Sequence, residues 1–362
     1  MSEPFEIFAS APPGLEPYLL AEILEAGFAN PVQVPGGVTF SGDWAKVARA
    51  NLILRGAGRV LARIGSFRAF HLAQLDKRAR KFAWANILRP DVPVRVDVTC
   101  RNSKIYHDRA ARSRIERAIQ ETIGAAIEPE APLRIMVRIE DDLVVISLDT
   151  SGAPLHQRGF KEAVGKAPMR ETLAALFLRA CGYDGHETVL DPMCGSGTFV
   201  IEAAQIAAGL APGREREFAF EHLALEVPRP TIAQNRPDKA LQFYGSDRDD
   251  GAIRAARANA VRAGIADSCE ITRAPISDLK RPEGPPGLVI VNPPYGARIG
   301  NRKQLFALYG ALGQVMKDRF SGWRFGMVTS DGGLARATGL SLNAGPPVAF
   351  GGLSVKLYQI KL

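Results

Sequence analysis

The chain has 362 residues, which is too long for one ordinary hydrophobic core and comfortable for two domains. Its formal charge of +8 and its pI of about 9.4 favour a polyanionic partner, although a generic basic surface would give the same charge balance. Four isolated cysteines without a C-x-x-C pair argue against a zinc or redox motif, so we expect no bound metal. Isolated cysteines also fit a reducing compartment, and no apolar run is long enough to span a membrane. We therefore expect a cytoplasmic protein.

The first 150 residues predict a small α+β region, because short strand-like runs and amphipathic segments follow one another. Gly36 and Gly37 separate two of the strand-like runs, so we expect a hairpin there. In chain order, the pattern predicts a strand at 6–10, a helix at 14–27, a hairpin at 32–42, a helix at 44–54, a strand at 59–70, a helix at 72–88, a strand at 92–100, a helix at 113–124 and two strands in 133–149.

From about residue 170, strands and helices alternate, which is typical of a parallel sheet covered on both faces. The pattern predicts helices at 171–182, 198–209, 251–264 and 305–320, strands at 188–195, 241–247, 269–275, 287–296 and 324–331, and a closing hairpin at 341–362. Prolines and charges in 211–239 interrupt the alternation. We interpret this segment as an insertion over the C-terminal edge of the sheet.

The stretch DPMCGSGTF at 191–199 lies between an apolar strand and an apolar helix. Gly195 and Gly197 permit a tight turn, over which a ligand can approach the helix N-terminus. The Lys-Ser/Thr pair of a phosphate-binding loop is missing, and the third glycine of a dinucleotide fingerprint would fall at Val200. Asp247 ends the next strand, where a carboxylate can accept both hydroxyls of a ribose. The pattern therefore favours a nucleoside site over an ordinary glycine turn with an aspartate as helix cap.

A rigid corner follows the next apolar strand, in VNPPYGARIG. The side-chain oxygen of Asn292 and the backbone carbonyl of Pro293 are two neighbouring acceptors, Pro294 fixes the corner, and Tyr295 supplies a face for a flat ring. Such acceptors match a planar exocyclic amine, whose lone pair would then face an electrophilic methyl group above the glycine turn. The alternative, a proline-rich loop with a core tyrosine, leaves this combination unexplained.

Six stretches carry a resemblance to a known family: GGVTFSGD (36–43), RNSKIYHDRAARSRIERAI (101–119), LHQRGFKEAVGKAPMRETLAA (155–175), DPMCGSGTFVIEAA (191–204), FYGSDRD (243–249) and NPPYGARI (292–299). They resemble the class I S-adenosylmethionine-dependent methyltransferases, and more closely the bacterial 23S rRNA guanine-N2 methyltransferases with a THUMP domain, here in a form with a single methyltransferase domain. The resemblance implies an α/β fold with a ferredoxin-like segment at 1–65, a THUMP RNA-binding domain at 66–155 and a Rossmann-like methyltransferase domain at 160–362.

The resemblance also implies the cofactor, S-adenosylmethionine, and the residues around it. The cofactor-binding residues would be Pro168, Glu171, Thr172, Asp191, Met193, Cys194, Gly195, Gly197, Asp247, Arg248, Ile276 and Asn292. Within this set Asp247 would hold the ribose, and the backbone of Ile276 would meet the adenine, because Pro275 stands where family members usually have aspartate. The catalytic residues would be Asn292, Pro293, Pro294 and Tyr295, which would hold the guanine.

Two basic segments of the N-terminal half could contact phosphates. They contain Lys77, Arg78, Arg80 and Lys81 in KRARK, and Arg109, Arg114 and Arg117 on one face of a helix. On the same helix Ile115, Ala118 and Ile119 share the opposite face. From charge alone a solvated surface is the more common outcome, whereas the family resemblance favours RNA contact. Tyr106 and His107 beside these arginines could stack on bases or serve as packing residues.

We therefore predict methylation of the N2 amine of a guanine in RNA, with 23S rRNA as the partner. Alternatives are an adenine-N6 DNA methyltransferase, methylation of a glutamine side chain in a protein, and a catalytically silent RNA-binding assembly factor. A THUMP-like region argues for structured RNA, and the intact Asp191, Gly195, Asp247 and Asn292 argue against a silent protein. We expect no membrane association and no obligate protein partner.

Overall fold

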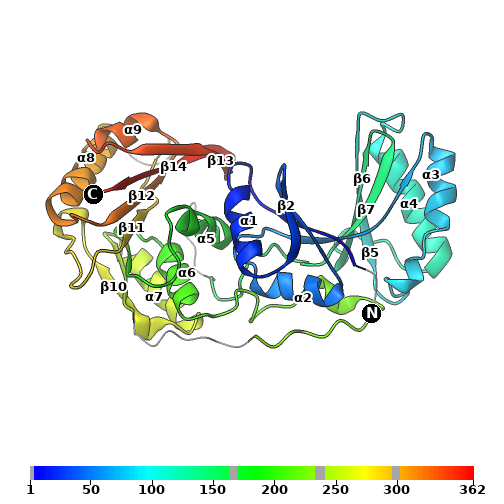
Figure 1. The fold of residues 1–362 in the computed structure, drawn as a ribbon, viewed down its shortest axis with the longest axis horizontal. Coiled ribbons are helices and arrows are strands. Elements are labelled where there is room, and N and C mark those ends of the chain that lie inside the picture. The colour runs from blue at the N-terminus through cyan, green and yellow to red at the C-terminus, as the bar shows by residue number, and fades with distance from the viewer. Residues whose placement is uncertain (1–3, 163–168, 233–240, 296–301) are drawn as a thin grey trace. The chain divides into compact units, whose positions relative to one another are not determined.

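The computed structural model describes residues 4–162, 169–232, 241–295 and 302–362. These residues form two compact units (Figure 1). The first unit consists of Met1–Ala11, Leu20–Leu155 and Arg216–Thr231, and the second of Pro12–Leu19, His156–Glu215 and Ile232–Leu362. Pro168, residues 296–299 of the corner motif and residues 233–239 of the expected insertion lie outside the described residues.

The first unit contains a seven-stranded sheet with the strand order β2-β3-β1-β4-β7-β6-β5. Its strands are β1 (Phe5–Ser10), β2 (Ala29–Val34), β3 (Gly37–Gly42), β4 (Val60–Arg68), β5 (Val94–Arg101), β6 (Leu133–Glu140) and β7 (Leu143–Asp149). β4 pairs with β1 on one side and with β7 on the other. Because β4 runs across the border that the sequence suggests at residue 65, the two predicted segments share this strand and one continuous sheet.

The helices of the first unit are α2 (Trp44–Ile53), α3 (Leu72–Arg80) and α4 (Asp108–Ile123), with a short 3-10 turn η1 (Trp84–Asn86). Helix α1 (Glu16–Glu25) is divided between the units, because the second unit includes Pro12–Leu19 and the first resumes at Leu20. The helix predicted at 72–88 is too long, because α3 already ends at Arg80. There the indole Nε1 of buried Trp84 donates to the carbonyl of Ala79 at 2.8 Å, so the chain turns back on its last helical carbonyls. The predicted hairpin around Gly36 and Gly37 is confirmed by the antiparallel pairing of β2 and β3.

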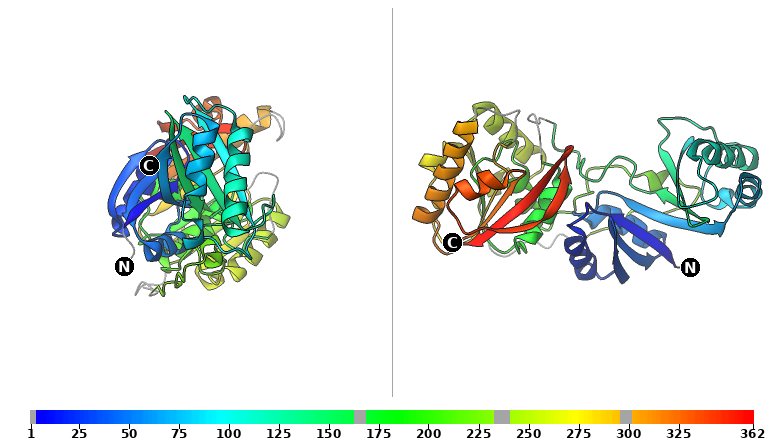
Figure 2. Two further views of the ribbon diagram at one scale, coloured as in Figure 1. Left: turned by 90° about the vertical axis from the view of Figure 1, so that its right-hand side faces the viewer. Right: turned by 90° about the horizontal axis from the view of Figure 1, so that it is seen from above.

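The second unit is an α/β unit with a seven-stranded sheet of order β10-β9-β8-β11-β12-β14-β13. Its strands are β8 (Val189–Asp191), β9 (Phe243–Asp247), β10 (Cys269–Arg273), β11 (Leu288–Val291), β12 (Arg324–Thr329), β13 (Asn343–Phe350) and β14 (Leu353–Lys361). β8 to β12 pair in parallel, while β14 and β13 form an antiparallel hairpin, drawn in red in Figure 2. The predicted fold class is confirmed, with a mixed rather than a purely parallel sheet.

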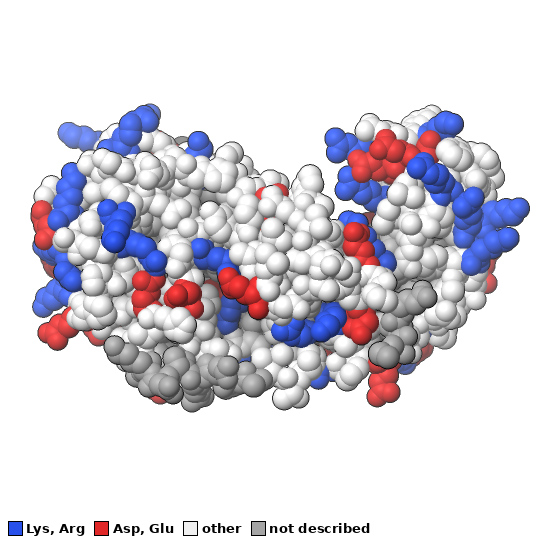
Figure 3. Space-filling model, in the orientation of Figure 1, with Lys and Arg blue, Asp and Glu red and all other residues white. Residues whose placement is uncertain are grey.

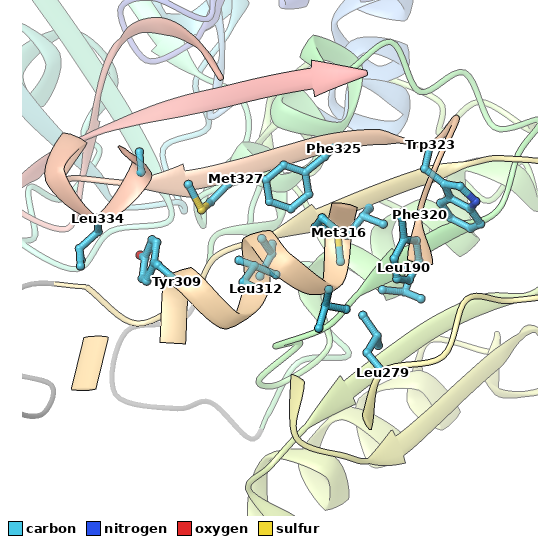
Figure 4. Close-up of a cluster of buried hydrophobic side chains, with 14 of the residues drawn as sticks. Leu190, Leu279, Tyr309, Leu312, Met316, Phe320, Trp323, Phe325, Met327 and Leu334 are labelled. Carbon is cyan, nitrogen blue, oxygen red and sulfur yellow. The ribbon is translucent and has the colours of Figure 1, made fainter. Parts of the chain in front are cut away.

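The helices of this unit are α5 (Glu171–Ala180), α6 (Thr198–Ala207), α7 (Asp250–Arg262), α8 (Arg302–Arg319) and α9 (Gly332–Ala337). α6 and α7 pack on β8, β9 and β10. α8 packs on the sheet through a buried cluster in which Leu312 and Met316 lie beside Phe325 and Met327 of β12 (Figure 4). Burial of this cluster orients the ends of β8 and β11, which carry the motifs predicted to bind a ligand.

The sequence expectation for 211–239 is wrong for its central part. Residues 216–231 belong to the first unit, and not to the edge of the second sheet. The backbone N–H of Phe220 donates to the carbonyl of Thr150 at 3.2 Å, and that of Ala224 donates to the carbonyl of Ile87 at 2.9 Å. The chain therefore returns to the first unit after it has already built β8 and α6.

Aromatic burial explains this return. Phe218 and Phe220 are only 2% and 1% exposed, and their rings stack with centroids 5.3 Å apart. Phe218 precedes the 3-10 turn η2 (Ala219–His222) and Phe220 lies within it, and this turn packs beside β6. Burial of two large apolar rings stabilises the folded chain. The prolines and charges elsewhere in the segment are typical of a surface loop, so the sequence pattern does not indicate this burial.

Replacing Phe220 by alanine should lower the stability of the first unit by roughly 3–5 kcal/mol, because a buried aromatic side chain is lost. Hydrogen–deuterium exchange should then accelerate in β4, β6 and β7 while β8 and β11 keep their protection. Phe306→Ala, at a ring of the second unit that is 38% exposed, is the control and should change neither. Loss of protection in β8 and β11 instead would place the segment on the other unit.

Candidate active site

The turn between β8 and α6 contains two glycines with different surroundings. Gly195 and Gly197 have φ angles of +52° and +86°, in the left-handed region that favours glycine. A Cβ on Gly197 would lie 3.1 Å from the Cβ of Ala256 in α7, so this glycine permits close packing of helices. A Cβ on Gly195 would meet no atom within 4 Å. Gly195 therefore faces open space, where a ligand can approach the backbone.

The carboxylate of Asp247 joins this turn to the end of β9. Its Oδ2 accepts a hydrogen bond from the backbone N–H of Gly195 at 3.1 Å, and its Oδ1 accepts one from Asp249 at 2.9 Å. The N–H of Cys194 donates to the carbonyl of Ser246 at 2.9 Å, which adds a second link between the turn and β9. Each carboxylate oxygen keeps a further lone pair, so Asp247 can still accept hydrogen bonds from a ribose.

Asp191, at the end of β8, is a buried carboxyl group with 2% exposure. Burial raises the pKa of Asp191 to about 8, against the effect of a hydrogen bond from Met193 N, and the nearby charge of Asp247 raises it further. Asp191 is therefore largely protonated at neutral pH. A cationic ligand beside it would favour the ionised form.

The N-terminus of α5 meets the N-terminus of α6 through a buried lysine. Lys161 Nζ lies 3.3 Å from Glu171 Oε1 and donates to Thr198 Oγ1 at 2.8 Å and to the carbonyl of Met169 at 2.7 Å. Burial raises the pKa of Glu171 and lowers the pKa of Lys161, while their mutual attraction opposes both shifts. Glu171 and its buried neighbour Thr172 thus lie next to the helix that follows the glycine turn, whereas Pro168 lies outside the described residues.

The corner after β11 begins beside the turn after β8, because these two strands are parallel neighbours. The strand order reverses between them, and in open α/β sheets ligands bind in the crevice at such a point. Asn292 follows β11, and its Oδ1 is buried without a hydrogen-bond partner among the residues that the structure describes. A buried acceptor without a donor costs about 1–3 kcal/mol, so a ligand that donates there would remove this penalty.

The side chain of Tyr309 in α8 contacts the backbone of the same corner. Its hydroxyl lies 3.3 Å from the carbonyl oxygen of Pro294, to which it can donate, and 3.2 Å from Thr329 Oγ1 of β12. Figure 4 labels Tyr309 in the buried cluster, and the half-buried ring of Tyr295 packs against that cluster. The corner is therefore held by side chains of two further elements, which fixes the position of its acceptors.

A cavity of about 470 Å³ lies against β8, β9 and β10. Its walls include Leu190, Tyr244, Ser246 and Thr272 of these strands and the segment 278–283. Asp278 belongs to this wall and follows half-buried Ile276 in the 3-10 turn η4 (Ile276–Asp278). The wall thus offers a carboxylate close to the position where the sequence predicts only the backbone of Ile276.

Comparison with known proteins finds family matches for two ranges of the chain. Residues 158–357 match the family model described as the RMKL-like methyltransferase domain, and residues 6–61 match the RlmL ferredoxin-like domain. The chain belongs to the RMKL-like methyltransferase family. The cofactor predicted from the sequence, S-adenosylmethionine, is the methyl donor of this family.

Similar proteins extend over nearly the whole chain. A ribosomal RNA large subunit methyltransferase K/L from Psychromonas ingrahamii is 35% identical over 90% of this chain, which spans about half (46%) of that protein. A protein from Listeria monocytogenes, named a predicted N6-adenine-specific DNA methylase, is 30% identical with a TM-score of 0.84, over 99% of this chain and 96% of that one. The structure of SMU.472 complexed with SAH is 28% identical with a TM-score of 0.84, over 100% and 99% of the two chains.

The candidate site of this family member contains most of the residues that the sequence predicts. The described residues bring Asp191, Met193, Cys194, Gly195, Gly197 and Asp247 together at the carboxyl ends of β8 and β9, with Asn292, Pro293, Pro294 and Tyr295 after the neighbouring strand. Arg248 is exposed directly after β9. The open face of Gly195 and the carboxyl groups of Asp191 and Asp247 adjoin one crevice with the Asn292 oxygen, which has no hydrogen-bond partner among the described residues. These residues therefore fit a nucleoside cofactor with a cationic centre.

Sequence reasoning missed Tyr309 and Lys161. Tyr309 follows the apolar spacing of its helix, so the sequence marks it as a core residue and gives no sign that its hydroxyl reaches the corner. Lys161 is one of many basic residues, and only the fold shows that it is buried against Glu171 and Thr198.

The predicted RNA contacts lie in the first unit. Lys77, Arg78, Lys81, Arg109 and Arg117 are exposed, while Arg80 and Arg114 are half-buried. On the face drawn in Figure 3, Lys and Arg side chains gather over the part that Figure 1 labels α3. Arg80 donates to Asp76 at 2.9 Å and also pairs with Glu121, so it is less free for a phosphate than its neighbours. The predicted buried face of α4, with Ile115, Ala118 and Ile119, is confirmed.

The described part of the chain was searched for metal-binding groups and for membrane-spanning helices. There, no group of three or more His, Cys, Asp or Glu residues is arranged to hold a metal ion. Nor does any described helix have the length and apolar character that a membrane crossing requires.

The raised pKa of Asp191 predicts a specific dependence of stability on pH. Between about pH 4 and about pH 8 the unfolded carboxyl group loses its proton while the folded one keeps it, so stability falls as pH rises. Relative to Asp191→Asn, which cannot titrate, the wild type should lose up to about 1.4 kcal/mol per pH unit in this range. Urea unfolding of both proteins across this range, without cofactor, measures the difference. Parallel pH profiles would contradict a raised pKa.

The two glycines should respond differently to substitution by alanine. Both variants adopt a left-handed backbone at a cost of roughly 1–2 kcal/mol, and Gly197→Ala adds the contact with Ala256. Urea denaturation should therefore show the larger loss of stability for Gly197→Ala. Calorimetric titration with S-adenosylmethionine should show that Gly195→Ala, although folded, binds more weakly, because its methyl group enters the open space. Unchanged affinity in Gly195→Ala would remove this glycine from the ligand's path.

Proposed function

We propose that the protein transfers a methyl group from S-adenosylmethionine to the exocyclic N2 amine of a guanine in large-subunit ribosomal RNA. One observation carries the proposal. The buried Oδ1 of Asn292 has no partner among the described residues, and it lies after β11, next to the glycine turn that follows β8. An acceptor kept unsatisfied at this point supports a substrate that brings its own N–H donor.

The corner has the features that a planar amine requires. Asn292 and the carbonyl of Pro293 would accept the two amine hydrogens, and the half-buried ring of Tyr295 would lie against the base. With both hydrogens held, the nitrogen lone pair would face out of the base plane. Tyr309 would keep this geometry by binding the carbonyl of Pro294. Such fixed acceptors act through alignment and need no strong base.

S-adenosylmethionine supplies an electrophilic methyl group when it is bound. Asp247 would accept the ribose hydroxyls through its remaining lone pairs, and Gly195 would let the cofactor approach the backbone. Asp191 and Glu171 would offer negative charge to the cationic methionine end. Pro168, Thr172, Met193, Cys194 and Gly197 complete the proposed binding set, with Arg248, Ile276 and Asp278 on the adenine side.

An RNA substrate is supported by the first unit. Its first part matches the RlmL ferredoxin-like domain, the related protein from Psychromonas ingrahamii is named for large-subunit rRNA, and the exposed cations of α3 and α4 suit phosphates. We assign residues 66–155 to a THUMP domain on this basis. Within it Lys77, Arg78, Lys81, Arg109 and Arg117 would contact the RNA backbone, with weaker contributions from Arg80 and Arg114.

A second candidate is methylation of adenine N6 in DNA. The similar protein from Listeria monocytogenes carries that name, and an Asn-Pro-Pro-Tyr corner accepts any planar exocyclic amine. The first unit favours RNA, because its match is to a domain of an RNA methyltransferase.

The decisive test combines a product analysis with variants of Asn292. Wild-type protein with labelled cofactor and unmodified 23S rRNA should yield N2-methylguanosine. Asn292→Ala should lower kcat about 10²–10³-fold with little change in cofactor affinity, because the lost hydrogen bond is strongest when the nitrogen develops positive charge. Asn292→Asp keeps an acceptor and should retain partial activity. Asn343→Ala, at an exposed position of β13, is the control and should behave as wild type.

The outcomes separate the parts of the proposal. Methylated adenine in DNA, without modified guanosine in RNA, would overturn the substrate and leave the chemistry of the corner intact. Full activity in Asn292→Ala would overturn that chemistry. Cofactor binding without transfer to any nucleic acid would support the silent RNA-binding alternative.

A further inference from the structure

Three loops of the first unit meet at one end of its sheet. β5 is parallel to β6, and β7 pairs antiparallel with both β6 and β4, so Arg101, Glu140, Leu143 and Arg68 lie in register at the same edge. The loops that leave this edge contain residues 69–71, 102–107 and 141–142. These three loops are far apart in the sequence, but they lie side by side at this edge of the sheet.

Hydrogen bonds fix the three loops to one another. Asp142 accepts from the N–H of Lys104 at its Oδ1 (2.8 Å) and from the N–H of Ala69 at its carbonyl (3.0 Å). Its own N–H donates to Ser103 Oγ at 3.0 Å. Asp141 and Asp142 both have positive φ angles, which these contacts hold in place. The edge is therefore a shaped surface and not a set of independent loops.

Aromatic rings project from this surface. Tyr106 is 71% exposed and Phe70 is 41% exposed, and both exceed what packing in a core would leave. The ring centroids of Tyr106 and exposed His107 are 4.1 Å apart, and Lys104 Nζ lies 4.9 Å from the centre of the Phe70 ring. Ile105 between them is buried and anchors the loop. Tyr106 is thus not a packing residue, and grouped exposed rings indicate a binding surface.

Exposed cations and acidic groups lie together around these rings. Arg68, Arg101, Lys104 and Arg109 are exposed around them, with Asp141 as an exposed acid in the same loops. The carboxylates of Asp142 and Asp108 accept backbone N–H groups, from Lys104 and from Cys100, and Glu140 lies 3.9 Å from Arg101, so these three acids are engaged within the loops and strand ends. Guanidinium and ammonium groups beside exposed rings match the phosphates and bases of a nucleic acid.

We propose that Tyr106, His107 and Phe70 form a stacking platform for unpaired nucleotides of the RNA substrate, with Arg101 and Lys104 contacting their phosphates. The proposal rests on the proposed function for RNA as the substrate. Bases in a duplex hide their faces in the stack, whereas bases of a loop or single strand expose them to aromatic rings. The platform thus selects RNA with unpaired nucleotides, a task different from the charge contacts of α3 and α4.

The test measures binding of two RNA probes to the full chain at one fixed salt concentration. The probes are a fluorescein-labelled single-stranded oligoadenylate and a blunt RNA duplex of equal length, followed by fluorescence anisotropy. Tyr106→Ala should weaken single-strand binding roughly tenfold, which corresponds to one stacked base, and leave duplex binding unchanged. Tyr106→Phe keeps the ring and should bind as wild type. Leu24→Ala, at a side chain that is 56% exposed in the same unit and carries no ring, is the matched control.

Each of the other possible results of this experiment contradicts a specific part of the proposal. Equal single-strand affinity in Tyr106→Ala and wild type would remove the platform, as would equal losses for both probes. An unchanged RNA affinity together with loss of a protein partner would make the surface a protein-binding site. A wild-type protein that binds neither probe would instead contradict the proposed RNA function, so the two failures are distinguishable.

Discussion

The carboxylate of Asp247 is the constraint on which the rest of the site depends. One of its oxygens binds the N–H of Gly195 and the other the N–H of Asp249, so a single side chain holds the turns after β8 and β9 in one arrangement. Charge-assisted bonds of this kind are stronger than neutral ones. The group expected to bind the ribose is therefore also the group that shapes the ribose site. Substitution of Asp247 changes both, and a loss of affinity alone cannot separate them.

Near the Asp247 hydrogen bonds, the second unit buries polar and charged side chains that an apolar core would not contain. Asp191 is buried with a raised pKa, and Lys161 and Glu171 are paired out of solvent. Within the part of the chain that the structure describes, the buried Asn292 oxygen has no hydrogen-bond partner. Each of these costs stability. The apolar cluster beneath α8 supplies stability in the same unit, since it buries Trp323, Phe320 and Phe325 together with Tyr309 (Figure 4). Natural proteins accept such local costs at functional sites.

Much of this arrangement could be predicted from the sequence. Parallel strands place their carboxyl ends at one edge, so the order of DPMCGSG, GSD and NPPY along the chain already brings Asp191, Asp247 and Asn292 together. Tertiary partners could not be predicted, because nothing local marks them. The tyrosine that reaches Pro294 resembles any core residue, and Phe218 and Phe220 stand in a segment whose prolines and charges indicate a surface loop. The length of α3 depends likewise on Trp84, beyond the helix.

The return of residues 216–231 to the first unit has a consequence for synthesis on the ribosome. Domains usually fold in order from the N-terminus as the chain emerges. Here all seven strands of the first sheet are made by Asp149, yet the aromatic pair that packs beside β6 emerges only after β8 and α6. The nascent chain must therefore begin its second unit before it can finish the first. During that interval the apolar surface awaiting Phe218 and Phe220 is open to chaperones.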